Sequence, residues 1–369
     1  MDDPCHSCVF CYSITKGLFA FSPQLFITLK STTMSKTSAD DYHLGFDLGG
    51  TKMLAVVYDA QFDPVGRNRM KTQASSGTES VLTRLVENID KALADAEIES
   101  TQLKSIGIGV PGAVNMQSGV VLGAVNLGWQ NVAVAQILQD KYNCPVQLLN
   151  DVDAGVFGES QFGAGKEANN VLGVFPGTGI GGGAVLNGQI VTGSKQTAME
   201  IGHIPVVPNG TRCGCGLKGC LETVASRLAI AGLAAQAAYR GSAPYLLEQV
   251  GTDISLMRSG VLAASVANGD TEIQAIIKRA CKYLGKAIGA MATILSPDVV
   301  ILGGGLAEAM PELFTKYTRK AARKNVVPIL RDTFEIKIAE LGDDASVLGA
   351  AIWGARSSKG HYQPTQTIN

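Results

Sequence analysis

The chain has 369 residues, with 31 Lys and Arg against 32 Asp and Glu, which gives a formal net charge of −1. This balance creates no global field that would draw the protein onto nucleic acid or anionic lipid, so neither is an expected partner. With 46% hydrophobic residues and 43 glycines, the composition excludes disordered and fibrous proteins. The length predicts about two domains, and the surplus of glycine predicts many places of close backbone approach.

Two long stretches, Ser105 to Gln139 and Val171 to Ser194, contain no charged residue. Pro111 and Pro176 interrupt them, together with many Gly, Asn and Gln residues. Neither stretch therefore offers the roughly 20 continuous apolar residues that a membrane-spanning helix needs. We expect buried strands and uncharged loops around a site, and no membrane association.

The start of the chain, residues 1–4, is acidic, whereas a secretory signal begins with basic residues. We therefore expect a cytoplasmic protein. In the reducing cytoplasm, clustered cysteines favour a metal site over disulfides. Residues 1–40 are predicted to form an N-terminal extension and residues 359–369 a tail. Within the extension, a C-x-x-C-x-x-C pattern at residues 5–11 allows an iron–sulfur or zinc site. The alternative is that synthesis begins at Met34 and that the extension is an upstream mis-start.

From Tyr42 onwards, strand and helix signals alternate. The predicted strands are Tyr42 to Asp47, Met53 to Asp59, Ser105 to Val110, Val146 to Leu149, Val171 to Phe175, Ala184 to Leu186 and Asp298 to Leu302. The predicted helices are Val81 to Ile98, Asn131 to Tyr142, Val224 to Tyr239, Thr271 to Leu295 and Ala345 to Arg356. A strand, a glycine turn with a threonine and a second strand occur twice, which predicts an internal duplication with two α/β lobes and a cleft between them.

Glycine-rich turns are the first candidate for chemistry. In the two repeated units they are Gly49-Gly50-Thr51 and residues 177–183, which include Gly177, Thr178, Gly179 and Gly181. Such turns let backbone N–H groups approach an anion, although many hairpins need glycine only for its positive φ. Two turns on two lobes favour a triphosphate that straddles the cleft, and no Walker pattern follows a strand. A third element, Gly303-Gly304-Gly305 after a strand, indicates a nucleotide loop or a tight strand-to-helix connection.

Two aspartates end predicted strands beside these turns. Asp151 lies at the carboxyl end of a strand, where α/β sheets place ligand groups, and could accept a proton from an alcohol that attacks a γ-phosphoryl group. Asp47 is positioned to orient Mg²⁺ or its waters. Helix capping is the competing explanation for both, and it is the preferred explanation for Asp153.

The sharpest local pattern combines one histidine with three cysteines: His203, Cys213, Cys215 and Cys220. One imidazole and three thiolates satisfy tetrahedral zinc, and four protein ligands indicate a structural ion; free core cysteines are the alternative. The flanking Glu200 and Glu222 could accept hydrogen bonds from the hydroxyls of a polyol, and the second ring nitrogen of His203 could donate one.

These motifs together resemble the ROK family of sugar kinases, within the actin, Hsp70 and sugar-kinase superfamily, and among its members the bacterial glucokinases. The resemblance covers about Tyr42 to Arg356. It rests on Phe46-Asp47-Leu48-Gly49-Gly50-Thr51-Lys52, Gly177-Thr178-Gly179-Ile180-Gly181-Gly182-Gly183, Asn150-Asp151, Glu200-x-x-His203 and Cys213-x-Cys215-Gly216-x-x-Gly219-Cys220-x-Glu222.

The resemblance implies a two-lobed, ribonuclease H-like α/β fold with a duplicated core, in which residues 41–150 with 345–358 form the small lobe and residues 151–344 the large lobe. It also implies ATP- and Mg²⁺-dependent phosphorylation of a hexose 6-hydroxyl, with glucose as the first expectation, and a homodimer. Asp151 would be the base, and Asn150, Glu200, His203 and Glu222 would hold the sugar. The first hairpin, with Asp47 to Lys52, would bind Mg²⁺ and phosphate, and the second hairpin and Gly303 to Gly305 would bind the nucleotide.

Two alternatives stay open. Met199, where the family usually has a small residue, bears on which hexose is used, so an N-acetylhexosamine kinase or a fructokinase is the runner-up. ROK-type repressors carry a helix-turn-helix domain before the first phosphate strand, and the 41 residues before Tyr42 show no paired helical periodicity and no basic cluster.

Overall fold

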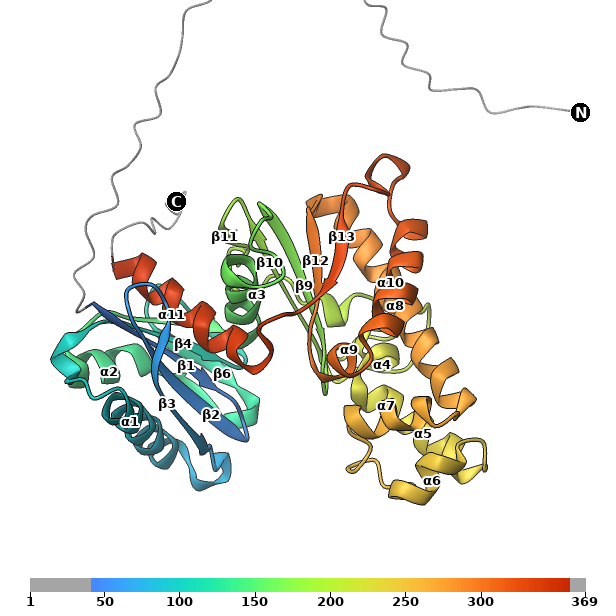
Figure 1. The fold of residues 1–369 in the computed structure, drawn as a ribbon, viewed down its shortest axis with the longest axis horizontal. Coiled ribbons are helices and arrows are strands. Elements are labelled where there is room, and N and C mark those ends of the chain that lie inside the picture. Colours follow the sequence, from blue (N-terminus) through green and yellow to red (C-terminus); the bar gives the residue numbers. More distant parts are fainter. Residues whose placement is uncertain (1–40, 359–369) are drawn as a thin grey trace, which may run out of the picture. The chain divides into compact units, whose positions relative to one another are not determined.

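The computed structural model describes residues 41–358 (Figure 1). The predicted N-terminal extension, its cysteine pattern, the alternative start at Met34 and the predicted tail lie outside these residues. Within residues 41–358, no helix is both long enough and apolar enough to cross a bilayer.

Two five-stranded sheets share one topology. The first has the order β3-β2-β1-β4-β8, and the second has the order β11-β10-β9-β12-β13. In each sheet the first three strands are antiparallel and the last two run parallel to the third. The strands of the first sheet are β1 (Tyr42–Leu48), β2 (Lys52–Tyr58), β3 (Pro64–Lys71), β4 (Leu103–Val110) and β8 (Val146–Asn150). Those of the second are β9 (Asn170–Pro176), β10 (Ile180–Leu186), β11 (Gln189–Ile190), β12 (Val299–Leu302) and β13 (Glu335–Ile338). The predicted duplication is confirmed at the level of strand order and direction.

A small antiparallel sheet follows β4 in the chain. It consists of β5 (Ala113–Asn115), β6 (Val120–Ala124) and β7 (Trp129–Val132). The predicted helix from Asn131 to Tyr142 is therefore wrong at its start, because Asn131 lies in β7 and the helix α2 begins only at Val134. Trp129 in β7 is buried, so this uncharged stretch contributes to the core.

The helices mostly cover the two large sheets. They are α1 (Thr78–Asp95), α2 (Val134–Tyr142), α3 (Asp151–Phe162), α4 (Glu222–Ala225), α5 (Arg227–Tyr239), α6 (Pro244–Val250), α7 (Ser259–Ala267), α8 (Thr271–Leu295), α9 (Gly305–Ala309), α10 (Pro311–Asn325) and α11 (Ala345–Ser358). The bounds of α8 are those predicted. The single helix predicted from Val224 to Tyr239 is wrong, because Ser226 has extended backbone and its side chain caps α5 by accepting a hydrogen bond from Ala229 N.

The strand β9 divides two hydrophobic cores. Val171 packs in the core that also contains the first sheet and α11, whereas Leu172 and Val174 pack in the core beneath α5 and α8. Successive side chains of a strand point to opposite faces, so both faces of the second sheet are buried. This explains why β9 reads as a continuous apolar run rather than an alternating one.

Helix α11 touches the first sheet backbone to backbone (Figure 1). A Cβ added to Gly45 on β1 would lie 1.9 Å from Val347 O, and one added to Gly107 on β4 would lie 1.7 Å from Ala350 O. No side chain fits in either space. Glycine at these two positions therefore lets the last helix lie directly on the central strands.

The same helix crosses α3 at an equally short distance. A Cβ on Gly158 of α3 would lie 2.2 Å from Ala345 O, and one on Gly349 of α11 would lie 1.9 Å from Ala154 O. The N-terminal turns of α3 and α11 are thereby brought together next to the end of β1.

We predict that Gly107→Ala destabilises the protein, because the new methyl group would collide with the α11 backbone. Overpacking of this kind typically costs about 1–3 kcal/mol, which thermal or denaturant unfolding measures. Gly232→Ala in α5 is the matched control. No atom lies within 4 Å of its added Cβ, so the gain in helix propensity, up to about 1 kcal/mol, should instead raise the free energy of unfolding. Equal stability of the two variants would contradict the packing argument.

Candidate functional site

Asp151 is the first residue of α3, directly after β8. The preceding Asn150 caps the helix: its Oδ1 accepts hydrogen bonds from Val152 N at 2.9 Å and Asp153 N at 3.3 Å, and its Nδ2 donates to Gly112 O at 3.0 Å. The cap is therefore Asn150, and helix capping accounts for neither Asp151 nor Asp153. Burial raises the pKa of Asp151, although hydrogen bonds from the Val152 N–H and the Asn150 side chain act in the opposite direction.

Asp47 lies at the end of β1, close to Asp151. Ser346 Oγ, in the first turn of α11, donates a hydrogen bond to Asp47 Oδ1 at 3.1 Å. Burial, and secondarily the negative charge of Asp151, raise the pKa of Asp47 to about 6, while Ser346 and Lys52 oppose the shift. The two carboxyl groups are therefore coupled, and a divalent cation between them would relieve their repulsion.

A cavity of about 340 Å³ brings together residues from distant parts of the chain. Asp47 and Asp151 line it with Gly304 and Gly305, so three of the predicted segments meet. The remaining lining comes from α3, Phe175, Glu308 and the segment from Ala339 to Ser346. This C-terminal segment was not predicted to take part.

The first glycine hairpin borders this cavity without lining it. The buried Thr72 holds its turn, because Thr72 Oγ1 donates to Gly49 O at 2.6 Å and Thr72 N donates to Thr51 O at 2.9 Å. Lys52, at the start of β2, reaches Asp343 on the cavity wall, with Nζ 2.7 Å from Oδ2. A cationic side chain thus stands at the rim of the acidic cavity.

The second glycine segment is shorter as a turn than predicted. Residues 181–183 lie within strand β10, and the turn is limited to Gly177, Thr178 and Gly179, with Gly177 N donating to Gly179 O at 2.9 Å. Arg227 fixes it: Arg227 N donates to Gly177 O and Arg227 Nη2 donates to Thr178 Oγ1, both at 2.8 Å. These residues do not line the cavity around Asp151.

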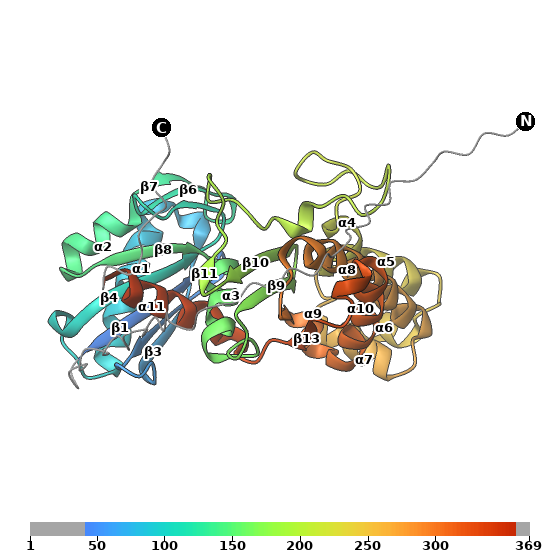
Figure 2. The same ribbon diagram turned by 90° about the horizontal axis from the view of Figure 1, so that it is seen from above.

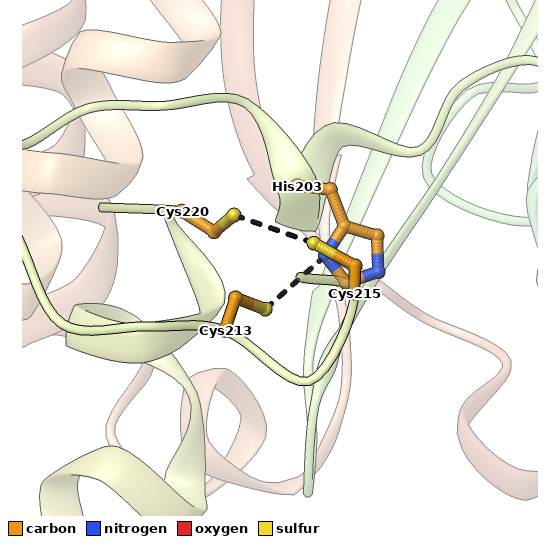
Figure 3. A group of neighbouring side chains, drawn as sticks. All are labelled: His203, Cys213, Cys215 and Cys220. Carbon is orange, nitrogen blue, oxygen red and sulfur yellow. Dashed lines mark hydrogen bonds between the residues drawn. The ribbon is translucent and has the colours of Figure 1, made fainter. Parts of the chain in front are cut away.

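The predicted zinc ligands converge. The ligand atoms of His203, Cys213, Cys215 and Cys220 all lie within 4.8 Å of one another (Figure 3). The Sγ atoms of Cys215 and Cys220 are 3.7 Å apart, and His203 Nδ1 is 3.6 Å from Cys213 Sγ. A tetrahedron with Zn–S bonds of about 2.3 Å and Zn–N bonds of about 2.0–2.1 Å has edges of about 3.8 and 3.6 Å. The donor set therefore fits a zinc ion.

The loop that carries the cysteines needs its glycines. Gly219 has a φ of 75°, and a Cβ there would lie 1.8 Å from Val207 O. Within the loop, Cys213 N donates to Leu217 O at 2.8 Å. The Leu217 N–H lowers the pKa of Cys215, which favours the thiolate that a metal requires.

Glu200 and Glu222 flank this cluster, as the sequence suggested. His203 Nε2, the ring nitrogen not directed at Cys213, is 3.9 Å from Glu200 Oε2. Glu222 Oε1 is 3.8 Å from Cys213 Sγ, and its Oε2 accepts a hydrogen bond from Ile180 N at 3.1 Å. Glu222 thereby connects the cysteine loop to the β9–β10 hairpin. Neither glutamate lines the cavity around Asp151.

Asp153 links the two halves of the site. Its carboxyl is buried, and burial, followed by the charges of Asp151 and Glu200, raises its pKa to about 7. Three carboxyl groups, those of Asp47, Asp151 and Asp153, thus have raised pKa values in one region, a pattern typical of functional sites.

Several residues of the site escaped sequence analysis. Asp343 and Ser346 follow β13, far from the glycine motifs, and no local pattern marks them. Outside the cavity, Gln196 lies in the loop before Glu200, and its Oε1 accepts a hydrogen bond from Met116 N in the β5–β6 turn. Arg227 was also missed, because the cap residue Ser226 that precedes it was placed inside a continuous helix.

A profile of the ROK family matches residues 43–357. The chain belongs to the ROK family. Its two-lobed α/β architecture is the actin, Hsp70 and sugar-kinase fold, as the sequence predicted.

The relatives of this ROK protein include both sugar kinases and repressors. A glucokinase from Halalkalibacterium halodurans is 34% identical over 317 residues, which cover 84% of this chain and 94% of that protein. A putative xylose repressor from Caldicellulosiruptor is 30% identical over 83% of this chain and 76% of its own length. The crystal structure of a ROK family glucokinase from Streptomyces griseus in complex with glucose and AMPPNP superimposes with a TM-score of 0.74 and 28% identity, covering 85% of this chain and 99% of that one.

The buried Asp153 gives this ROK protein a predictable pH dependence. The folded chain keeps the proton of Asp153 up to about pH 7, whereas an unfolded Asp releases it near pH 4. Asp153 therefore lowers the free energy of unfolding as the pH rises through this interval, by up to about 1.4 kcal/mol per unit. Asp153→Asn, which stays neutral, should gain stability relative to the parent between pH 4 and pH 7 in thermal unfolding.

Asp63→Asn is the control, because Asp63 is exposed. Its difference from the parent should stay constant over the same pH range. A constant difference for Asp153→Asn as well would contradict the raised pKa.

Proposed function

We propose that this ROK protein is a glucokinase that transfers the γ-phosphoryl group of ATP to the 6-hydroxyl of glucose. The observation that carries the proposal is the position of Asp151, which opens α3 in the same cavity as Asp47 and the glycines of the β12–α9 connection. The relatives named glucokinase support this substrate and this donor.

In the proposed reaction, Asp151 is the general base. The oxygen of the sugar 6-hydroxyl attacks the γ-phosphorus, its proton passes to a carboxylate oxygen of Asp151, and the bond from the γ-phosphorus to the bridging oxygen breaks to release ADP. Burial raises the pKa of Asp151, and a more basic carboxylate accepts this proton more readily. The Val152 N–H, which donates to Asp151 Oδ1 at 2.9 Å, keeps the carboxylate oriented.

Asp47 and Ser346 would hold Mg²⁺ or its waters at the cavity. A cation bound there supplies charge neutralisation for the transferred phosphoryl group. Lys52 would serve the same purpose at the rim, together with the N–H groups of the first hairpin, Gly49, Gly50 and Thr51.

The nucleotide would lie between the two glycine hairpins and the third glycine element. The residues assigned to it are Gly177, Thr178, Gly179, Gly181, Gly303, Gly304 and Gly305. Gly304 has a φ of 79°, a conformation that favours glycine, and its N–H donates to Glu308 Oε1 at 3.0 Å. Arg227 would fix the Thr178 hydroxyl for this contact.

The sugar would be held by Asn150, Glu200, His203 and Glu222. The electrostatic effect of Glu200 on Asp153, two residues after the proposed base, supports a sugar position between these carboxylates and Asp151. Zinc bound by His203, Cys213, Cys215 and Cys220 would fix the His203 ring, so that Nε2 could donate to a sugar hydroxyl.

We infer a small lobe of residues 41–150 with 345–358 and a large lobe of residues 151–344, a homodimer, and a cytoplasmic enzyme that acts in glycolysis and other carbohydrate metabolism. The two sheets of equal topology support the division into lobes.

A sugar-responsive repressor is the second candidate, since one relative is named a xylose repressor. The acidic cavity favours the kinase, because a binding protein needs no buried base there. A gel-shift assay at physiological salt should give no sequence-specific DNA binding, and specific binding would favour the repressor.

The substrate is tested with a coupled assay of ADP release across glucose, mannose, fructose, N-acetylglucosamine and N-acetylmannosamine. Glucose should give the highest kcat/KM. A higher kcat/KM for an N-acetylhexosamine or for fructose would contradict glucose as the substrate, although the protein would still be a sugar kinase.

Asp151→Asn should lower kcat by at least about 10²-fold, the lower end of general-base contributions, because the amide cannot accept the hydroxyl proton. The KM for sugar should change much less. Asp140→Asn, on the exposed side of α2, is the control and should keep parental kinetics. Turnover of Asp151→Asn close to that of the parent would remove Asp151 from its role.

Cys215→Ser should lower bound zinc and the melting temperature together, because a four-ligand site contributes to folding. Elemental analysis by mass spectrometry and thermal unfolding measure the two effects. Cys144→Ser, at a cysteine outside the cluster, should keep its zinc. A parent protein purified without zinc would refute the metal site.

A further inference from the structure

Exposed basic side chains gather on helices α8 and α10. This basic face consists of Arg279, Lys282 and Lys286 on α8, Lys316, Arg319, Lys320, Arg323 and Lys324 on α10, and Arg331 beyond α10, all of them exposed. The chain as a whole has a formal net charge of −1. The positive charge is therefore concentrated locally, although the total composition gives no sign of it.

The two helices lie side by side in both views (Figures 1 and 2). Two glycines of α8 permit this contact: a Cβ on Gly285 would lie 2.5 Å from Thr318 O, and one on Gly289 would lie 2.8 Å from Asn325 O. Close packing brings the basic side chains of both helices to the edges of a common groove.

Two grooves flank Lys320 and Lys324. One, of about 550 Å³, runs between the helices and is also lined by Arg279, Lys282 and Lys286. The other, of about 1000 Å³, lies on the opposite side of α10, and its lining is six basic residues with Thr315 and a single acid, Glu312. Both grooves therefore present positive charge along their length.

Few neighbouring acids neutralise this face. Arg323 pairs with Asp332 at 3.2 Å, and Arg319 donates to Ile336 O at 3.1 Å. Across residues 41–358, no ion pair involves Arg279, Lys282, Lys316, Lys320 or Lys324.

The order of residues along α10 places like charges next to one another, where they repel. Lys316, Lys320 and Lys324 follow one another at i,i+4 spacing, as do Arg319 and Arg323, and like charges at that spacing destabilise a helix. The cost of each pair is small, and an anion bound along the row would offset that repulsion.

The spacing of the charges favours an extended anion. Residues four apart on a helix are separated by a rise of about 6 Å, so the row from Lys316 to Lys324 spans about 12 Å. A single phosphate group cannot contact that whole row, whereas a chain of linked phosphates can follow it.

The side chains that line the grooves argue against a protein partner and against single-stranded nucleic acid. Protein interfaces depend on buried aromatic or aliphatic anchors. The groove beside Lys316 and Arg319 has no large apolar side chain in its lining, and the groove between the helices has two half-buried tyrosines, Tyr283 and Tyr317. Single-stranded nucleic acid stacks its bases on aromatic rings. Here the ring of Tyr317 is covered by the ammonium groups of Lys278 and Lys316, at 5.3 and 5.9 Å from its centroid.

We propose that the basic face is a binding site for linear polyphosphate, an anion recognised by its charge and its length. This inference goes beyond the proposed sugar phosphorylation and does not depend on it. No transfer of phosphate from the bound chain is implied.

The test titrates the purified full chain with three probes: long-chain inorganic polyphosphate, inorganic orthophosphate and a DNA duplex. Binding is measured by isothermal titration calorimetry or by competition in fluorescence anisotropy. Long-chain polyphosphate should bind, its affinity should fall as salt rises, and the double variant Lys320→Glu/Lys324→Glu should lose at least about tenfold in affinity. This variant should fold, because it removes like-charge pairs from α10, and its glucose phosphorylation should be unchanged. Lys320→Gln/Lys324→Gln, which adds no negative charge, should show a smaller loss in the same direction.

Lys91→Glu/Lys166→Glu is the matched control, because it makes the same change in net charge at exposed lysines elsewhere, and it should keep parental affinity. Equal loss in both double variants would overturn the proposal, since only total charge would then matter. Absence of polyphosphate binding at low salt, or tighter binding of the DNA duplex, would also overturn it.

Discussion

The crossing of α3 and α11 fixes the geometry on which the candidate site depends. Gly158 and Gly349 let the two helices touch through their backbones, and the first turns of both helices therefore meet at the end of β1. Asp151 comes from one of these turns and Ser346 from the other, and Asp47 lies between them on the sheet. A larger residue at either glycine would separate the groups that the proposed phosphoryl transfer needs together.

The electrostatics of the site follow from this crowding. Asp47, Asp151 and Asp153 all have raised pKa values because they are buried close together. Each carboxylate would be more stable beside a cation, and the two cationic side chains at the rim, Lys52 and Arg69, already pair with Asp343. The site is thus suited to a metal-bound phosphate, in contrast to the basic face, whose excess charge has the opposite sign.

The features that could be predicted from the sequence are those that local patterns encode. The glycine hairpins, the terminal residues of α8 and the cysteine loop were predicted, because a turn, a 3.6-residue period and a metal-ligand spacing are properties of short segments. The helix break at Ser226 was missed since one capping side chain outweighs a continuous apolar pattern. Asp343 and Ser346 were missed for a different reason: only tertiary contacts bring them to the site. Asp153 was misread as a cap because the competing Asn150 cap is visible only in the structure.

The position of α11 in the chain has a consequence for how the protein is made. The strands of the first sheet end at Asn150, but the helix that lies on Gly45 and Gly107 starts only at Ala345. At 5–20 residues per second, translation takes roughly 10–40 s to cover that interval. During this time the apolar face of β1 and β4 has no permanent cover, so this face is exposed to aggregation until α11 has been made.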